Sequence, residues 1–274
     1  MIDGHTRVIP HLAWPSGHVQ TPRVFNARAA ELGINAVVVP WEVPADRLAA
    51  TLAGLRGVAT VPGMIVTIPH KEAVAPFCDR LEGAAAMMRV ANVIRRDDDG
   101  TLVGAMYDGR GFVAGLCADG FEPEGRRCLV LGAGGAASAI AHALAEAQAC
   151  EVLIANRDPA RAEALADKLR VVFPGVAIAA GAADARGFDL VVNATSVGLS
   201  GDPNMPIDPA SIGPSMVVAD IIMKPAMTPL LHAAAARGAR VHLGAHMLAA
   251  QIDLFLRFLL PGLAAAAFSH LETA

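Results

Sequence analysis

Short apolar runs recur along the chain and alternate with segments that carry helix-start signals. Runs of about four to eight apolar residues between turn residues are typical of buried strands. Such runs lie at residues 7–10, 35–40, 64–67, 90–95, 101–105, 129–131, 151–155, 176–179, 189–193, 216–220 and 239–242. Because strands that alternate with helices assemble into largely parallel sheets, the pattern predicts an open α/β fold.

Several predicted helices begin at a proline. Thr21-Pro22 and Thr228-Pro229 each combine an N-cap residue with proline at the first helical position, and Pro44 begins a helix to roughly Leu55. The strand at 64–67 runs directly into Ile68-Pro69-His70-Lys71, where we expect a further helix to start.

An acidic turn and a C-terminal helix pair complete the pattern. Asp97-Asp98-Asp99-Gly100 separates two strand signals and predicts a hairpin whose glycine supplies a positive φ. The helices from about Gly244 onward have no strand after them, so we expect them to pack back on the first part of the chain.

A glycine-rich turn follows the strand at 129–131. Gly132, Gly134 and Ala137 fit the pattern G-x-G-x-x-G/A, and an alanine-rich helix follows from Ser138 to Ala147. The first glycine permits the tight turn, the second lets the backbone approach a pyrophosphate, and the alanine keeps helix and strand close. The free N–H groups and dipole of that helix favour an anion. Alone, the motif also fits a turn that binds nothing.

The next strand indicates which dinucleotide this site would take. A dinucleotide domain contacts the adenosine ribose about 20 residues past its glycines. Asn156 and Arg157 stand there and suit a 2′-phosphate, which favours NADP. Asp158 has two interpretations: it caps the helix that starts at Pro159, or it holds the ribose of NAD. We therefore predict NADP, with NAD as the alternative.

Composition and charge exclude several classes of protein. The 274 residues are 54% hydrophobic and 18% charged, enough for one large or two ordinary domains with a sizeable core. A net charge of −4 with no basic run longer than two residues argues against nucleic acid as a partner. The N-terminus lacks an apolar signal core, and polar residues interrupt Met247–Leu260, so we expect no membrane span.

Cysteine and histidine spacing bears on metals and on location. The four cysteines show no metal-ligand spacing and indicate reduced thiols in a cytoplasmic protein. We expect no metal, because His70 and His246 lack a partner at ligand spacing; we interpret both as structural or substrate-contacting histidines.

Lys71 and Asp108 are candidates for proton transfer. Lys71 would sit in the first turn of a helix, where the helix dipole disfavours a positive charge. Asp108 opens a predicted helix to about Asp119 and could simply cap it. Together they could form an ammonium near a hydroxyl oxygen, positioned by a carboxylate. The alternative is a solvated surface lysine and a capping aspartate.

The order of these motifs resembles the shikimate/quinate dehydrogenase family over almost the whole chain. The run Val66-Thr67-Ile68-Pro69-His70-Lys71 is similar to the family's catalytic-lysine motif, and Asp108–Phe112 to its catalytic-aspartate motif. Further similar segments are Val90–Ile94, Gly132–Ala137, Asn156-Arg157, Asn193–Gly198, Thr228–Leu231 and Gly244–Gln251.

The resemblance implies a two-domain architecture. A substrate-binding and catalytic α/β domain would span residues 1–106, completed by C-terminal helices at 243–274. A Rossmann-type NADP-binding domain would span 107–242, with a cleft between the two.

The resemblance also assigns roles to individual residues. Lys71 and Asp108 would be catalytic. Substrate would contact Thr21, Thr67, Asn92, Tyr107 and Gln251. The cofactor would contact Gly132, Ala133, Gly134, Gly135, Ala136, Asn156, Arg157, Arg161, Thr195, Ser196, Val197 and Gly244.

Four departures from the family pattern lie near the expected substrate. Val19 replaces the first serine of an early His-Ser-x-Ser-Pro loop, although Thr21 keeps a hydroxyl. Met106-Tyr107 replaces Asn-Thr, Met223 replaces a tyrosine, and Ile252 replaces a glycine. We therefore expect the chemistry to be kept and the substrate to differ, with poor activity on shikimate and quinate.

The expected activity is NADP-dependent interconversion of a ring secondary alcohol and its ketone, of the shikimate/3-dehydroshikimate type that serves aromatic amino acid biosynthesis. Lys71 would accept or return the hydroxyl proton with help from Asp108. The partner would be a small hydroxylated ring, and the protein a monomer or homodimer. The alternatives are a dehydrogenase for a related non-shikimate cyclic alcohol and a catalytically silent NADP-binding regulatory module.

Overall fold

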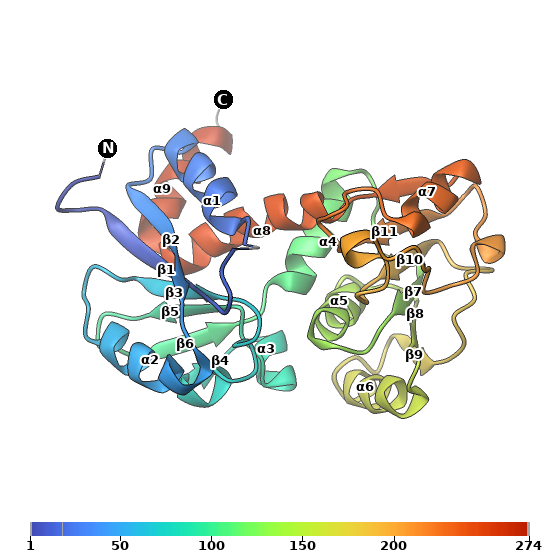
Figure 1. The fold of residues 1–274 in the computed structure, drawn as a ribbon, viewed down its shortest axis with the longest axis horizontal. Helices are drawn as coiled ribbons and strands as arrows, with labels where there is room; N and C mark the ends of the chain where they lie inside the picture. Colours follow the sequence, from blue (N-terminus) through green and yellow to red (C-terminus); the bar gives the residue numbers. More distant parts are fainter. Residues whose placement is uncertain (1, 18, 273–274) are drawn as a thin grey trace. The chain divides into compact units, whose positions relative to one another are not determined.

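The chain divides into two units, each built around one β-sheet (Figure 1). The computed structural model describes residues 2–17 and 19–272. The first unit comprises Met1–Tyr107 and Gln251–Ala274, and the second comprises Asp108–Ala250. The later division falls inside a helix, whereas we expected all of residues 243–274 to belong to the first domain.

The strands of the first unit run in the order β2-β1-β3-β5-β6-β4. Strand β5 is antiparallel to β3 and β6, and the other pairs are parallel. β5 and β6 form the predicted hairpin, and Gly100 at its tip has a φ of +86°. The bounds are β1 (Arg7–Ala13), β2 (Ala36–Glu42), β3 (Gly63–Val66), β4 (Arg80–Leu81), β5 (Val93–Arg96) and β6 (Leu102–Ala105).

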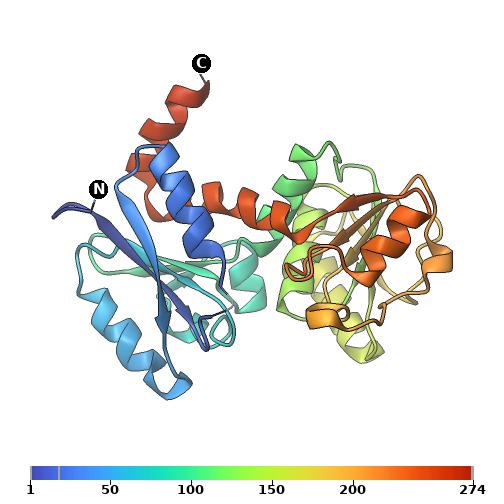
Figure 2. The ribbon, with the colours of Figure 1, turned by 45° about the horizontal axis from the view of Figure 1, so that its top comes forward.

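Helices cover both faces of this sheet. Figures 1 and 2 show α1 and α9 on one side and α2 on the other. Neighbouring residues of β3 point to these opposite faces, as the pleat requires. Met64 packs in the cluster that holds Leu52 of α2, whereas a Cβ on Gly63 would lie 2.6 Å from the Leu259 side chain of α8. The bounds are α1 (Thr21–Glu31), α2 (Leu48–Arg56), α3 (Ala84–Met88), α8 (Gly244–Leu259) and α9 (Pro261–Glu272), with short 3₁₀ turns η1 (Ala45–Arg47) and η2 (Ala75–Phe77).

The strands of the second unit are all parallel, in the order β12-β11-β10-β7-β8-β9. The chain starts in the middle of the sheet, runs to one edge and returns to fill the other, which is the Rossmann arrangement. The bounds are β7 (Arg127–Leu131), β8 (Glu151–Ala155), β9 (Ala177–Ala180), β10 (Leu190–Asn193), β11 (Val217–Asp220) and β12 (Arg240–His242). The predicted α/β class and Rossmann-type unit are confirmed.

Two helices of this unit, α4 and α5, pack closely through small residues. The alanines of α5 are buried at Ala137, Ala139, Ala141 and Ala143. A Cβ on Gly109 of α4 would lie 1.9 Å from the backbone oxygen of Ala139, so α4 and α5 approach backbone to backbone. The bounds are α4 (Asp108–Ala118), α5 (Gly135–Glu146), α6 (Pro159–Val172) and α7 (Pro229–Ala236), with 3₁₀ turns η3 (Leu199–Gly201) and η4 (Pro209–Ser211).

Three local predictions were wrong. The helix expected from Ile68 is a series of turns ending in η2. Lys71 therefore lies on a turn, and the helix-dipole argument for it does not apply. The N-cap of α1 is Gln20 rather than Thr21, and α5 begins at Gly135 rather than Ser138.

Within the described residues, no helix has the length and apolarity needed to cross a bilayer.

Candidate functional site

A pocket of about 1240 Å³ lies at the carboxyl edge of the parallel sheet in the second unit. The loops that follow β7, β8, β9 and β10 line it, and a parallel sheet binds ligands at this edge. Of the predicted cofactor residues, the lining includes Gly132, Ala133, Gly134, Asn156, Arg157, Arg161, Thr195, Ser196 and Val197. It does not include Gly135, Ala136 or Gly244.

The glycine turn after β7 needs its glycines for separate reasons. Gly132 has a φ of +116°, and a Cβ there would lie 3.0 Å from the backbone oxygen of Ala194 in the loop after β10. A Cβ on Gly134 would meet nothing within 4 Å, so the space above it is open. No side chain caps α5, whose first turn starts at this open position. The uncapped N–H groups and the helix dipole make this an anion-binding position.

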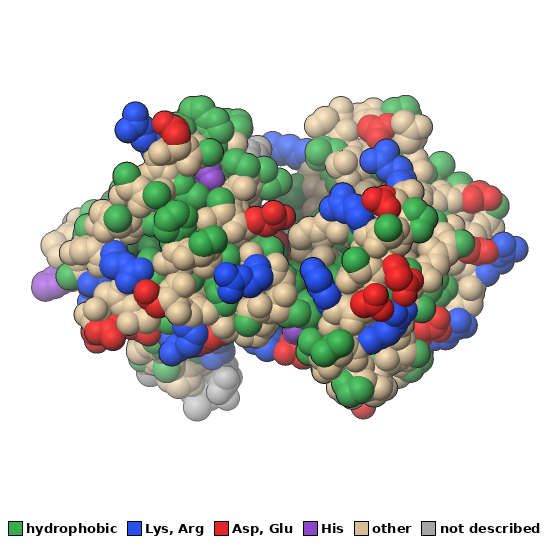
Figure 3. All heavy atoms as spheres, turned by 90° about the horizontal axis from the view of Figure 1, so that it is seen from below, with side chains coloured by type: hydrophobic (Ala, Val, Ile, Leu, Met, Phe, Trp, Pro, Cys, Tyr) green, Lys and Arg blue, Asp and Glu red, His purple; other side chains and the backbone are tan. Residues whose placement is uncertain are grey.

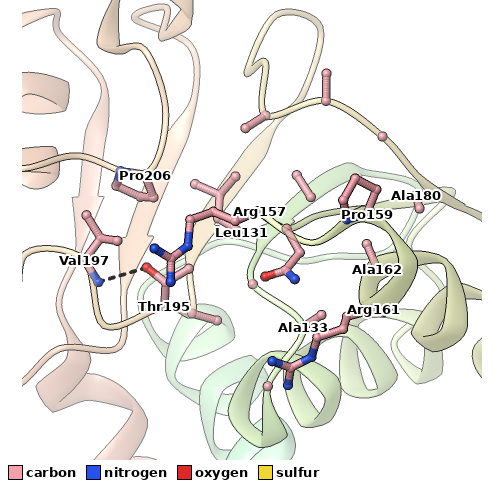
Figure 4. A pocket seen from close by; sticks show the side chains of 18 of the residues that line it. Leu131, Ala133, Arg157, Pro159, Arg161, Ala162, Ala180, Thr195, Val197 and Pro206 are labelled. Carbon is pink, nitrogen blue, oxygen red and sulfur yellow. Dashed lines mark hydrogen bonds between the residues drawn. The ribbon is translucent and has the colours of Figure 1, made fainter.

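Two arginines bring positive charge to the same pocket. Figure 4 shows the Arg157 side chain extending toward the Thr195 loop, while Arg161 lies beside the turn that carries Ala133. Both are exposed, and neither forms an ion pair within the described part of the chain. The pocket thus combines two guanidinium groups with a helix N-terminus, which suits a ligand with phosphates at two positions.

Asp158 is the N-cap of α6, as one of its two interpretations held. Its carboxylate accepts from the N–H of Ala160 at 3.0 Å, and the side-chain amide of Asn156 donates to its backbone oxygen at 3.0 Å. Two acids line the pocket, and both have partners: Glu163 pairs with Arg170, and Asp202 accepts from backbone N–H groups. The arginines therefore set the sign of the charge offered to a ligand.

The side chain of Asn193 organises the loop after β10. Its Oδ1 accepts from the backbone N–H and the hydroxyl of Thr195, at 3.0 and 2.7 Å, and its Nδ2 donates to the backbone oxygen of Val197 at 3.0 Å. The Thr195 hydroxyl in turn accepts from the N–H of Val197. The loop is therefore preorganised by its own hydrogen bonds.

A buried carboxylate connects this loop to α7. Asp220 Oδ2 accepts from Asn193 Nδ2 at 2.9 Å and from the Thr228 hydroxyl at 2.8 Å, and its Oδ1 accepts from the N–H of Ile222. Burial raises the pKa of Asp220, and the three donors oppose that rise. Thr228 is the N-cap of α7, as predicted.

The predicted substrate residues lie in the first unit. Asn92 is buried and its Oδ1 accepts from the N–H of Tyr107 at 2.9 Å, while the backbone oxygen of Lys71 accepts from Ala91 at 2.9 Å. These bonds hold the Lys71 turn beside the strand ends at Asn92 and Tyr107. Thr67 follows β3 directly.

The other predicted residues of this set are placed by helices. Thr21 is buried at the start of α1, and Gln251 is buried in α8. The Tyr107 ring packs edge-on against Phe255 and Phe258 of α8. Asp108, the other predicted catalytic residue, is the buried first residue of α4 in the second unit.

The two histidines named from the sequence differ in environment. His70 is structural: it is buried, and its Nε2 lies 2.7 Å from the backbone oxygen of Val43. The statement that His246 lacks a partner at ligand spacing was wrong. Its Nδ1 lies 3.2 Å from that of His242 and 3.4 Å from Asp119 Oδ2. The i, i+4 spacing of the two histidines was visible in the sequence, but the closeness of Asp119 to them was not.

Sequence reasoning missed two parts of the pocket lining. These are the small residues after β9 and the segment after η3, namely Ala180, Gly181, Ala182, Ala183, Asp202, Asn204, Met205 and Pro206. No motif marks these residues in the sequence. Only the strand order could have indicated the loop after β9, because β9 borders β8 and its following loop must lie beside Arg157.

Charge on the surface is mixed. On the face drawn in Figure 3, basic and acidic side chains are interspersed. Ion pairs such as Arg110–Glu146 and Arg127–Glu151 account for part of this mixing.

The chain is similar to known proteins over both of its units. Residues 12–94 match the model of the shikimate dehydrogenase substrate binding domain, and residues 117–200 match that of shikimate / quinate 5-dehydrogenase. A shikimate dehydrogenase (NADP(+)) of Geobacter metallireducens is 42% identical over 258 residues, covering 91% of this chain and 90% of the relative. One from Rubrobacter xylanophilus is 42% identical over 247 residues, covering 86% and 84%.

Solved structures are similar over nearly the whole chain. Shikimate 5-dehydrogenase of Thermus thermophilus, in complex with NADP(H) and shikimate, has a TM-score of 0.83 and 30% identity, covering 98% of this chain and 99% of that chain. The 5-ketofructose reductase of a Gluconobacter strain has a TM-score of 0.86 and 30% identity, covering 98% and 100%. With both domain models matched and relatives at this identity, the chain belongs to the shikimate dehydrogenase family.

Proposed function

We propose that this protein is an NADP-dependent oxidoreductase that interconverts a secondary alcohol and a ketone on a small ring, of the shikimate/3-dehydroshikimate type. The observation that carries the proposal is the pocket of the second unit, where the N-terminus of α5, which no described side chain caps, meets two arginines that form no ion pair with the described residues. Membership of a family whose curated relatives are named NADP(+)-dependent shikimate dehydrogenases supports it.

The residues of the pocket fit NADP in both charge and space. Gly134 leaves room for the pyrophosphate above the first turn of α5, and Arg157 supplies a guanidinium for the 2′-phosphate. Asp158 is engaged as the cap of α6, which supports NADP over NAD. When bound, the nicotinamide supplies hydride transfer to or from the carbon that bears the oxygen.

Lys71 and Asp108 carry the proton in this proposal. Lys71 Nζ takes the hydroxyl proton during oxidation and returns it during reduction, and its positive charge stabilises negative charge on the oxygen. The carboxylate of Asp108 helps to position the Lys71 ammonium for this transfer. Ala91, whose N–H donates to the backbone oxygen of Lys71, keeps the Lys71 turn beside Asn92, whose buried side chain accepts from the N–H of Tyr107.

The identity of the ring substrate has a second candidate. Val19 stands where the family pattern has a hydroxyl-bearing residue, and Met223 replaces another. The Gluconobacter 5-ketofructose reductase, which is named for a different ketone, is as similar in structure as the shikimate enzymes. A small cyclic or sugar-derived alcohol without a carboxylate is therefore the alternative substrate class.

Steady-state assays with NADP+ and NAD+ on a panel of alcohols test the proposal. The panel contains shikimate, quinate, cyclic polyols without a carboxylate, and reduced keto sugars. We expect NADP-dependent turnover, with a high KM for shikimate and quinate. NADP binding without turnover of any of these compounds would indicate a silent regulatory module instead.

A further inference from the structure

Three side chains converge on one point in the second unit, and the proposed dehydrogenase chemistry uses none of them. They are Asp119, just after α4, His242, at the end of β12, and His246, in the first turn of α8. Asp119 Oδ2 lies 2.9 Å from His242 Nδ1 and 3.4 Å from His246 Nδ1, and the two Nδ1 atoms are 3.2 Å apart.

The packing of α4 against the start of α8 brings these residues together. A Cβ on Gly115 of α4 would lie 3.0 Å from the backbone oxygen of His246, so any other residue there would push the two backbones apart by a few tenths of an ångström. The N–H of Asp119 then bonds to the backbone oxygen of Gly115, which orients the aspartate beside the histidines. His246 lies four positions after His242, and the turn between them is closed by the hydrogen bond from the N–H of His246 to the backbone oxygen of Leu243.

The three separations are somewhat shorter than the edges of a tetrahedral metal site but close to them. Bonds of about 2.0–2.2 Å from a zinc ion place neighbouring tetrahedral ligands roughly 3.3–3.6 Å apart. The separations of 2.9, 3.2 and 3.4 Å approach this range, so side-chain shifts of a few tenths of an ångström complete the geometry. Asp119 and His246 are each more than a third exposed, which leaves a fourth position open toward solvent.

The protons of this cluster cannot be arranged so that every close pair of atoms forms a good hydrogen bond. His242 is 1% exposed, and its Nε2 has no hydrogen-bond partner among the described residues, so its polar contacts are all at Nδ1. Two imidazole nitrogens and a carboxylate oxygen therefore face one another. If both Nδ1 atoms carry a proton, both can donate to Asp119 but the two N–H groups oppose each other; if only one does, the lone pair of the other nitrogen faces the carboxylate. An ion in their midst accepts a lone pair from each of them.

We propose that Asp119, His242 and His246 bind one divalent transition-metal ion, of which zinc is the expected member. Two imidazoles with one carboxylate suit zinc and its neighbours, whereas magnesium and calcium select oxygen ligands. The site joins the ends of α4 and β12 to the start of α8. It is distinct from the NADP pocket, whose lining includes none of these three residues.

Metal titration of the tag-free protein after chelator treatment tests the proposal. We expect Zn²⁺ to bind with one ion per chain in calorimetry, and Co²⁺ to give the intense visible absorption of tetrahedral coordination. Zn²⁺ should displace the cobalt signal, while an excess of Mg²⁺ or Ca²⁺ should not. Absence of stoichiometric Zn²⁺ binding would overturn the proposal and leave a hydrogen-bonded triad.

Variants at the exposed ligands identify the site. His246→Ala and Asp119→Asn should each weaken Zn²⁺ binding by at least about tenfold, the lower bound seen even for groups that only support a ligand. His232→Ala is the matched control, because His232 is an exposed histidine of α7 outside the cluster. Thermal unfolding in the presence of chelator checks that each variant folds. Equal Zn²⁺ affinity in His246→Ala and His232→Ala would place the ion elsewhere and refute the site.

Discussion

Asn193 donates its side-chain amide to Asp220 at 2.9 Å, with both side chains fully buried. The same amide group also fixes the Thr195 loop, so the carboxylate of β11 acts on the pocket through one intermediate residue. The loop therefore depends on a group that would not touch the ligand.

Asp220→Asn should destabilise the protein although it preserves shape. Both carboxylate oxygens of Asp220 accept hydrogen bonds, and the amide can accept at only one of them. A buried donor left without a partner costs about 1–3 kcal/mol. Urea unfolding should show this loss of unfolding free energy, while Asp46→Asn at an exposed position should show little change. An Asp220→Asn protein as stable as the parent would mean that this network contributes nothing.

Arg157→Ala should weaken NADP binding by roughly 10–100-fold and leave NAD binding nearly unchanged. Only NADP presents a 2′-phosphate, and a charge-assisted hydrogen bond contributes about 1.5–3 kcal/mol. Fluorescence titrations with both cofactors measure the two affinities. Arg186→Ala is the control, since that exposed arginine pairs with Asp184 and does not line the pocket. A native preference for NAD would show that the arginine has another role.

Lys71→Ala should lower kcat by roughly 10²–10⁴-fold, which is the usual contribution of a general acid–base group. NADP affinity should stay the same, because Lys71 is in the first unit and the cofactor pocket is in the second. Lys168→Ala, on the exposed face of α6, controls for loss of a lysine. Unchanged turnover in Lys71→Ala, on the best substrate found, would remove this lysine from the mechanism.

Val19→Ser combined with Met223→Tyr should improve shikimate turnover about tenfold or more, chiefly through a lower KM. Each change restores a hydroxyl that the family pattern has, and one hydrogen bond to a charged group is worth about a factor of ten. Comparing kcat/KM of parent and double variant on shikimate measures the effect. An ordinary KM for shikimate in the parent protein would show that the two departures are neutral.

Mild acid should destabilise the protein through His142. Burial lowers the pKa of His142 below the model-peptide value of 6.5, so the unfolded chain binds this proton more readily than the folded one. Its contribution to stability is therefore complete above pH 6.5 and is lost as the pH falls below that value. Urea unfolding of the parent and of His142→Leu should be measured between pH 5 and 8. The unfolding free energy of the variant should fall less at acid pH than that of the parent. Parallel pH profiles would exclude this histidine as the cause.

Local signals predicted much of the second unit. Asp158-Pro159 specified a capped helix start, and the cap is present. Gly132 was predicted for its tight turn, but its closeness to Ala194 was not, because that contact joins two loops about sixty residues apart. Side chains at strand ends were predictable because a parallel sheet brings such ends to one edge.

Two helix-start predictions in the first unit were wrong because a local sequence signal was misleading. A proline in the first turn favours a helix, and this favoured a helix at Pro69, where the chain forms turns instead. The threonine of Thr21-Pro22 could have capped α1, yet it is buried at the first helical position. Spacing alone could not connect Asp119 with the two histidines, because 123 residues separate Asp119 from His242.

The contact between Gly109 and Ala139 fixes α4 at a single distance from α5. Asp108 begins α4, and Asp119 directly follows it. Because α4 is held against α5 by this contact, both ends of α4 keep the same position relative to α5. One hydrogen atom in place of a side chain at position 109 thus sets the location of both carboxylates, one assigned to proton transfer and the other to a metal. A larger residue there would be expected to disturb both functions at once, although it belongs to neither.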